Sequence, residues 1–170
     1  AEDIFEEMWV MPDASYTLSN TTSAQKMFNV GANGALTLPI GTYRFSVGFS
    51  MATMSTTSGN AGWSILGSGS ATISAMRGFV CGKEDTPTVG ALSGASFTTT
   101  ATLNPMVTAA ISANMGSTIF GYFRVSAAGT IIPSISLGTA IATASVIQGS
   151  YMFVQRISTS ATLGSYGPWS

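Results

Sequence analysis

The stretch from Gly41 to Met51 limits the possible fold more than any other part of the chain, because its side chains alternate strictly between two kinds. The apolar set is Tyr43, Phe45, Val47, Phe49 and Met51, and the small or polar set between them is Arg44, Ser46, Gly48 and Ser50. Such period-two alternation indicates a β-strand with one face in a core and the other facing polar surroundings. The chain is therefore expected to contain a sheet with one buried face.

Charged residues make up only 8% of the 170 residues, about a third of the ~25% that is usual in soluble domains. Hydrophobic residues make up 45%, which is enough for a packed core. A monomer with so few charges would hydrate its surface poorly, so we expect part of it to be buried against further copies or a larger assembly. We expect no membrane partner, because Gly, Ser, Thr or Asn interrupts every apolar run well before the ~18 residues of a transmembrane helix.

The net charge of −1 hides an uneven distribution. Residues 1–13 contain five acidic residues and no basic one, whereas the remaining residues contain two acidic and six basic ones. The resulting positive excess is thinly spread along a long segment. It is too weak to predict nucleic-acid binding.

The acidic N-terminal segment also contains apolar residues that would be costly to leave in water. These are Ile4, Phe5, Met8 and Trp9. The spacing of the first three fits one face of a single helical turn, which Pro12 would end. Two interpretations are open: a frayed terminus, or an arm over residues 1–14 that docks into a groove of a partner protein. We favour the docking arm, because its aromatic and acidic residues occur together and would suit a basic partner surface.

From Ser15 onward the composition changes to Ser, Thr, Gly and Ala with periodic apolar residues. This is typical of an all-β domain with many short strands, which we expect to extend over residues 15–170. After 41–51, the strongest strand candidates are 119–127 and a closing strand over 149–157. Together with weaker candidates they give roughly eight to ten strands, enough for two packed sheets.

Turn and breaker residues separate these strands. Asn33-Gly34 is the strongest turn signal, and Pro133 indicates an edge position or a bulge within its strand. Residues 88–118 leave two interpretations open: a Thr-rich strand, or a helix that begins at Pro105. We favour the strand because the surroundings are all-β.

Two strand candidates share the pattern Gly-x-Tyr-x-Phe, at residues 41–45 and 149–153. The pattern resembles strands in the jelly rolls of tumour-necrosis-factor-like proteins and of complement globular heads. Three longer runs, over residues 16–29, 54–61 and 123–133, are similar to small virion proteins of tailed phages and prophages. The resemblance covers about residues 16–157 and leaves out the acidic arm.

The resemblance implies an antiparallel two-sheet jelly-roll sandwich that assembles as a homotrimer on a virus particle. In trimers of this shape, one sheet of each subunit faces the threefold axis, and low charge with many small residues suits such packing. A possible trimer interface contains three arginines on strong strands beside aromatics: Arg44, Arg124 and Arg156. They would pair with acids or carbonyls across a subunit boundary, the alternative being that they face solvent.

Residues that usually carry catalysis or bind metals are rare. The chain has no histidine, which excludes the usual catalytic triads and His-based zinc sites. Cys81 is the only cysteine, so it forms no intrachain disulfide or metal-binding cysteine cluster, and we expect a small buried apolar residue. Glu84 and Asp85, the only acids outside the arm, are adjacent and poorly placed to act as an opposed pair. We predict a non-enzymatic protein without metal or cofactor.

The leading hypothesis is a structural protein of a phage virion, made in the host cytoplasm and located on the particle surface. In this hypothesis a homotrimeric decoration or cement protein is attached by its arm to the major capsid protein or another virion protein. The alternative is a trimeric tail-fibre tip or adhesin that binds a host surface glycan or receptor through loop aromatics such as Trp63 or Trp169. A cytokine-like secreted module is a third reading, which the lack of a visible signal peptide and of disulfides disfavours.

Overall fold

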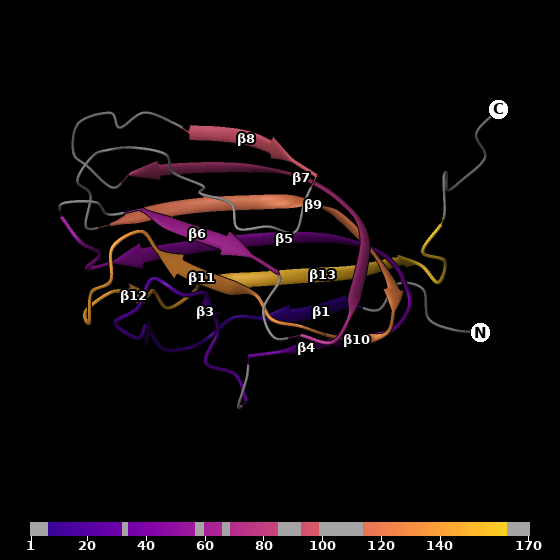
Figure 1. Cartoon of the computed structure of the whole chain (residues 1–170), viewed down its shortest axis with the longest axis horizontal. Helices are drawn as coiled ribbons and strands as arrows, with labels where there is room; N and C mark the ends of the chain where they lie inside the picture. Colours follow the sequence, from indigo (N-terminus) through magenta and orange to yellow (C-terminus); the bar gives the residue numbers. More distant parts are fainter. Residues whose placement is uncertain are drawn as a thin grey trace.

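The computed structural model describes residues 7–31, 34–56, 60–65, 69–84, 93–98 and 114–162 (Figure 1). This described part of the chain is all-β, with thirteen strands and no helix, as the sequence predicts. The strands are β1 (Glu7–Val10), β2 (Tyr16–Thr17), β3 (Gln25–Lys26), β4 (Leu36–Leu38), β5 (Gly41–Ala52), β6 (Ala61–Ser64), β7 (Thr72–Glu84), β8 (Ser93–Phe97), β9 (Met115–Ala127), β10 (Gly129–Ile131), β11 (Ser134–Leu137), β12 (Ser145–Val146) and β13 (Tyr151–Ser158).

The strands form antiparallel sheets in an arrangement consistent with a β-sandwich. The large sheet has the order β1-β13-β5-β9-β7-β8, with β12 pairing both β5 and β2. A second sheet has the order β3-β11-β6, and β10 and β4 form a separate pair. In Figure 1, β6 and β11 lie over β5 and β13 of the large sheet.

The core lies between these two layers, and β5 shows why. Every apolar residue of its alternating pattern is buried, with at most 3% of its surface exposed. The Phe45 ring stacks on Trp63 of β6 with 5.9 Å between centroids, and this contact joins the two layers. Tyr43 stacks on Phe123 of β9 at 5.4 Å and donates its hydroxyl hydrogen to the Pro39 carbonyl at 2.7 Å. The buried face predicted from 41–51 is therefore confirmed.

The start of the described chain differs from the predicted helical turn. Residues 7–10 form β1, an edge strand that pairs with β13 and places Met8 opposite Val154. Met8 and Val10 pack half-buried against the core, whereas Trp9 faces outward. An isolated helical turn fixes the backbone of several residues and forms only one hydrogen bond in return. Pairing with the open edge of β13 instead forms a series of backbone hydrogen bonds. Residues 1–6, with Ile4 and Phe5, lie outside the described residues.

Two of the predicted breaks are also located. The strand expected around Pro133 is divided into β10 and β11, with Pro133 between them. Gly34 has the positive φ of +59° expected of a turn glycine, and its N–H donates to the Val30 carbonyl at 2.9 Å. Within the ambiguous segment 88–118, β8 and the start of β9 are strands, whereas almost all of the Thr-rich run favoured as a strand lies outside the described residues. Residues 99–113, with Pro105, lie outside the described part.

Candidate interaction surface

One row of cross-strand neighbours on the outer face of the large sheet is almost entirely aromatic. The row, called here the aromatic row, runs Trp9, Phe153, Ser46, Phe120 and Phe79 across five adjacent strands. Trp9 is 60% exposed, Phe120 49% and Phe79 48%. The rings touch in pairs, with centroids 4.6 Å apart for Trp9 and Phe153 and 5.6 Å apart for Phe79 and Phe120. An exposed apolar patch of this continuity is typical of a protein interaction site.

The next row along the same face, called here the basic row, is polar and positively charged. It runs Glu7, Gln155, Arg44, Tyr122 and Arg77. Gln155 donates from Nε2 to Glu7 Oε1 at 2.9 Å, which holds that carboxylate at the edge of the sheet. Arg44 and Arg77 are both exposed on either side of Tyr122. Since neighbouring strands lie about 4.8 Å apart, the two arginines start roughly 10 Å from each other.

A hollow of about 360 Å³ lies where the two rows meet. Its walls are the side chains of Arg44, Phe120 and Phe153, and Ser46 and Gly121 form part of its lining. The Arg44 guanidinium carbon lies 5.6 Å from the centroid of the Phe153 ring, within cation–π range. The hollow therefore combines a positive charge with two aromatic surfaces.

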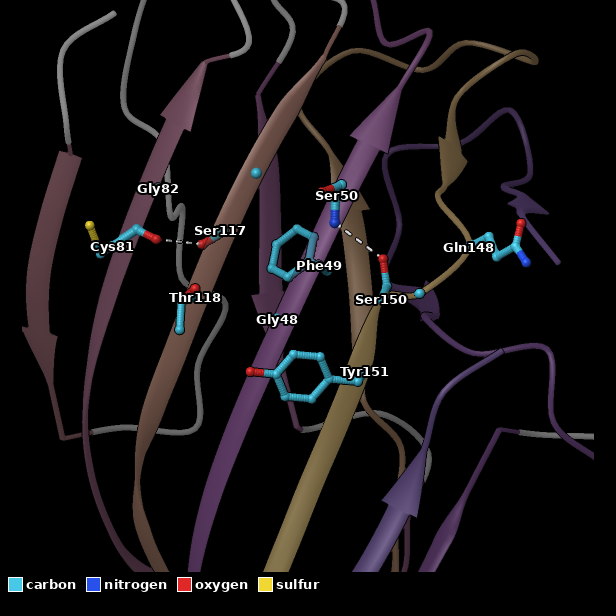
Figure 2. Close-up of a pocket in the computed structure, with 12 residues that line it drawn as sticks. Gly48, Phe49, Ser50, Cys81, Gly82, Ser117, Thr118, Gln148, Ser150 and Tyr151 are labelled. Atoms are coloured by element: carbon cyan, nitrogen blue, oxygen red, sulfur yellow. Dashed lines mark hydrogen bonds between the residues drawn. The ribbon is translucent and has the colours of Figure 1, made fainter. Parts of the chain in front are cut away.

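A larger open groove of about 510 Å³ crosses the other end of this face (Figure 2). Figure 2 shows the Tyr151 ring lying beside Gly48 with its hydroxyl directed toward β9, and Gln148 on the loop at one side. A Cβ at Gly48 would overlap the Tyr151 ring, so glycine allows the ring to lie flat on the strand. The loop before β13 is fixed to β5 by a hydrogen bond from the Ser50 N–H to Ser150 Oγ at 3.1 Å. None of the described residues that line it is charged.

The three arginines of the expected interface do not share one surface. Arg44 and Arg124 lie on the outer face, where Arg124 is partly buried two residues along β9 from Tyr122. Arg156 is opposite Tyr43 on the inner side of the sheet and is only 8% exposed. It donates from Nη2 to the Ile40 carbonyl of its own chain. Side chains alternate between the two faces along β13, and this alternation points Arg156 to the same side of the sheet as the core residues of that strand.

The prediction that Cys81 is buried is wrong, because the structure exposes it. Val80 and Gly82, its neighbours in β7, are buried on the inner side of the sheet. Strict alternation along the strand therefore turns Cys81 outward, toward the groove that it helps to line. Residue type favours burial of cysteine, but strand position decides here.

Trp63 cannot serve as the loop aromatic of a glycan site. It lies in β6, all four residues of which are buried, and it is 1% exposed. Its ring is held between the sheets by Phe45, so no ligand can reach it without unfolding the sandwich. Trp169 lies outside the described residues.

Sequence reasoning missed the aromatic row, although β9 carries a signal for it. Ile119 and Phe123 point into the core, whereas Phe120 and Tyr122 point out. A strand that is apolar on both faces is normally covered on both faces. The run from 119 to 123 could therefore have predicted exposed aromatic residues on the outer face of the sheet.

Comparisons with protein-family models and with curated protein sequences find no match to this chain. Within the described ranges, no three His, Cys, Asp or Glu side chains gather in a way that could hold a metal ion. The same residues include no helix long and apolar enough to cross a membrane.

Proposed function

We propose that the chain is a non-enzymatic structural protein of a phage virion. It acts as a homotrimeric jelly-roll decoration or cement protein and is attached to the particle through its N-terminal segment. The observation that carries this proposal is the exposed aromatic row on the outer face of the large sheet. Further support comes from the scarcity of charge and from the resemblance of three sequence runs to small virion proteins of tailed phages.

Covering the aromatic row would stabilise an assembly substantially. An aromatic side chain has on the order of 150–250 Å² of surface, and burial contributes about 25 cal/mol per Å². Each half-exposed ring, such as Phe79 or Phe120, would thus add on the order of 2 kcal/mol when covered. Arginine and tyrosine are also enriched at interface cores, so Arg44 and Tyr122 beside the row suit the same role.

The strand order supports the jelly-roll form of the sandwich. In the large sheet β13, β5 and β9 are neighbours although they are far apart in the sequence, and the same holds for β3, β11 and β6. Chain crossings of this kind between two antiparallel sheets are what a jelly roll requires. One feature departs from a symmetric arrangement: β7 pairs with β9, which leaves only three strands in the second sheet.

The homotrimer is tested by the native mass of the purified protein, measured by light scattering. We expect three copies for the unchanged chain and a smaller species after Phe79→Ser with Phe120→Ser. Thr37→Ser on β4, at an exposed position away from this face, is the control and should remain trimeric. A stable monomer of the unchanged protein would rule the homotrimer out.

Attachment to the particle is tested by co-sedimentation with phage particles that lack the protein. A chain without residues 1–6 keeps β1 but loses Ile4, Phe5 and three acidic residues, so we expect it to remain in the supernatant. Asp13→Asn removes an acidic residue from the other side of β1 and should sediment normally. Undiminished co-sedimentation of the shortened chain contradicts attachment through this segment.

A second candidate function is a trimeric fibre tip or adhesin that binds a host glycan. The observation that favours it is the groove of Figure 2, whose described lining is uncharged and includes the Tyr151 ring together with Ser50, Thr118 and Gln148. Sugars are commonly bound by an aromatic face with neutral hydrogen-bonding groups around it. Saturable binding of neutral polysaccharide that Tyr151→Ala and Gln148→Ala both abolish would favour this function. Binding that survives both changes would argue against it.

A further inference from the structure

The basic row contains two arginines whose charge is not balanced within the described part of the chain. No described carboxylate pairs with Arg44 or Arg77, and the guanidinium carbon of Arg44 lies 5.6 Å from the centroid of the Phe153 ring. The nearest acid in the same row is Glu7, which is already bonded by Gln155. This surface therefore has the charge of a site for an acidic partner.

The adjoining hollow specifies a second property of that partner. Its walls are formed by Arg44, Phe120 and Phe153, and its volume of about 360 Å³ is enough for an apolar or aromatic side chain. A matching ligand would place such a side chain between the two phenyl rings. Its carboxylates would then lie next to Arg44 and Arg77.

Residues 1–6 of this chain have this combination. They contain the acids Glu2, Asp3 and Glu6 together with Ile4 and Phe5, and no basic side chain. Fully extended, six residues span roughly 20 Å. This length exceeds the roughly 10 Å between the two arginines, so one segment can contact both.

The segment is better placed to reach another copy than to fold back over its own sheet. Residue 7 is fixed in β1 by pairing with Gln155 and by the hydrogen bond to its carboxylate. A return over the same face would need a sharp reversal directly before it. Ile4, Phe5 and Glu6 are poor turn residues, because none is Gly, Pro, Asn, Asp or Ser.

We propose that residues 1–6 of one copy dock on the basic row of a second copy, with Phe5 in the hollow and the acidic residues on Arg44 and Arg77. This inference rests on the proposed homotrimer and names a second copy as the protein that receives the arm; removal of residues 1–6 would then weaken attachment to the particle through loss of the trimer and not through loss of a direct contact with the particle. The segment then holds two copies together as a clasp, and its charged contacts add to the contact that the aromatic row makes between copies.

The test uses the full-length protein alone, without particles, and a dilution series in analytical ultracentrifugation. The first variant reverses the receiving side with Arg44→Glu and Arg77→Glu, and the second reverses the arm with Glu2→Lys, Asp3→Lys and Glu6→Lys. We expect each to raise the concentration at which the assembly half-dissociates by about tenfold or more, and the combined variant to recover most of the loss. The control is Lys26→Glu, which reverses a charge on β3 of the other sheet.

The outcomes separate this inference from the function on which it rests. If the unchanged protein is a trimer and neither reversal alters its dissociation, the clasp is refuted and the homotrimer stands. If the unchanged protein is a monomer, the homotrimer itself fails. If the combined variant restores thermal stability without any change in association, the arm docks on its own sheet and the proposal between copies is refuted. Circular dichroism checks that all variants keep their strands, which the exposure of both arginines leads us to expect.

Discussion

The two faces of the large sheet carry similar residues in very different surroundings. Phe123 on the inner face of β9 is fully buried against Tyr43 and Phe45, whereas Phe120 on the outer face of the same strand is 49% exposed. Both belong to aromatic clusters with ring centroids about 5–6 Å apart. The difference is that the second sheet covers one face, and nothing in the described chain covers the other. An aromatic pattern along a strand thus indicates that this face of the sheet is stabilised by burial. It does not tell whether another part of the same chain or a partner buries it.

The largest difference between the two faces should appear on truncation of the buried ring. Phe123→Ala removes a side chain that the core encloses completely, so we expect the free energy of unfolding to fall by about 3–5 kcal/mol. Urea denaturation followed by circular dichroism measures this. A loss below about 1 kcal/mol would mean that the inner face is not the packed core.

A smaller effect is expected at the buried arginine. Arg156→Met leaves the Ile40 carbonyl without its donor and should lower the free energy of unfolding by about 1–3 kcal/mol. The matched change on the outer face is Arg44→Met, which should alter the monomer by no more than about 0.5 kcal/mol. Equal losses for the two variants in urea denaturation would contradict the placement of these arginines on opposite faces.

Two glycines of β9 test how closely the strands approach. A Cβ at Gly121 would overlap the Arg77 carbonyl and lie 2.6 Å from the Gly78 Cα, whereas one at Gly116 would meet nothing nearer than Ser50 Oγ at 3.8 Å. We expect Gly121→Ala to lower the free energy of unfolding by about 1–3 kcal/mol, since the backbone of the neighbouring strand β7 must shift to make room for the methyl group. Gly116→Ala should stay within about 0.5 kcal/mol of the unchanged protein in the same calorimetric measurement. Similar melting temperatures for both variants would be the contradicting result.

A smaller loss than at Phe123 is expected at the exposed ring. Phe120→Ala removes a side chain of which only about half is buried, so a dilute monomer should lose about 1–2 kcal/mol, well below the loss at Phe123. The same substitution should weaken self-association clearly, because the ring belongs to the aromatic row and also lines the hollow beside Arg44. A large loss of monomer stability with no change in native mass would show that the outer face is structural within one chain.

The sequence predicted the strands that have long alternating patterns and not how they are arranged. The strands β5, β9 and β13 were identified because their buried and exposed residues alternate over many positions. The sequence does not predict which strands lie next to one another, because a pairing such as that of Tyr43 with Arg156 joins segments that are far apart in the chain. The four-residue strand β1 was taken for a helical turn, since so short a segment fits both periods.

The candidate surface was predicted only in part. Arg44 and Trp9 were named and lie on it, but for Arg156 and Cys81 the predicted surroundings were wrong. Chemical type gave the wrong surroundings for both: an arginine is expected outside and a cysteine inside. Position along the strand decides instead, since side chains alternate between the faces regardless of type. The aromatic row depends on the alignment of five strands, which local patterns do not contain.

The central position of β5 has a consequence for how the protein folds. Gly41 pairs with Val125 and Tyr43 pairs with Arg156, so both neighbours of β5 are synthesised long after it. Folding dominated by such distant pairings is slow, on the order of milliseconds to seconds. Until β9 and β13 have been synthesised, β5 with its three aromatic residues has two open edges that can pair with other nascent chains. The scarcity of charge would suit the proposed assembly, but during synthesis it favours aggregation, so the yield of the protein should depend strongly on growth temperature.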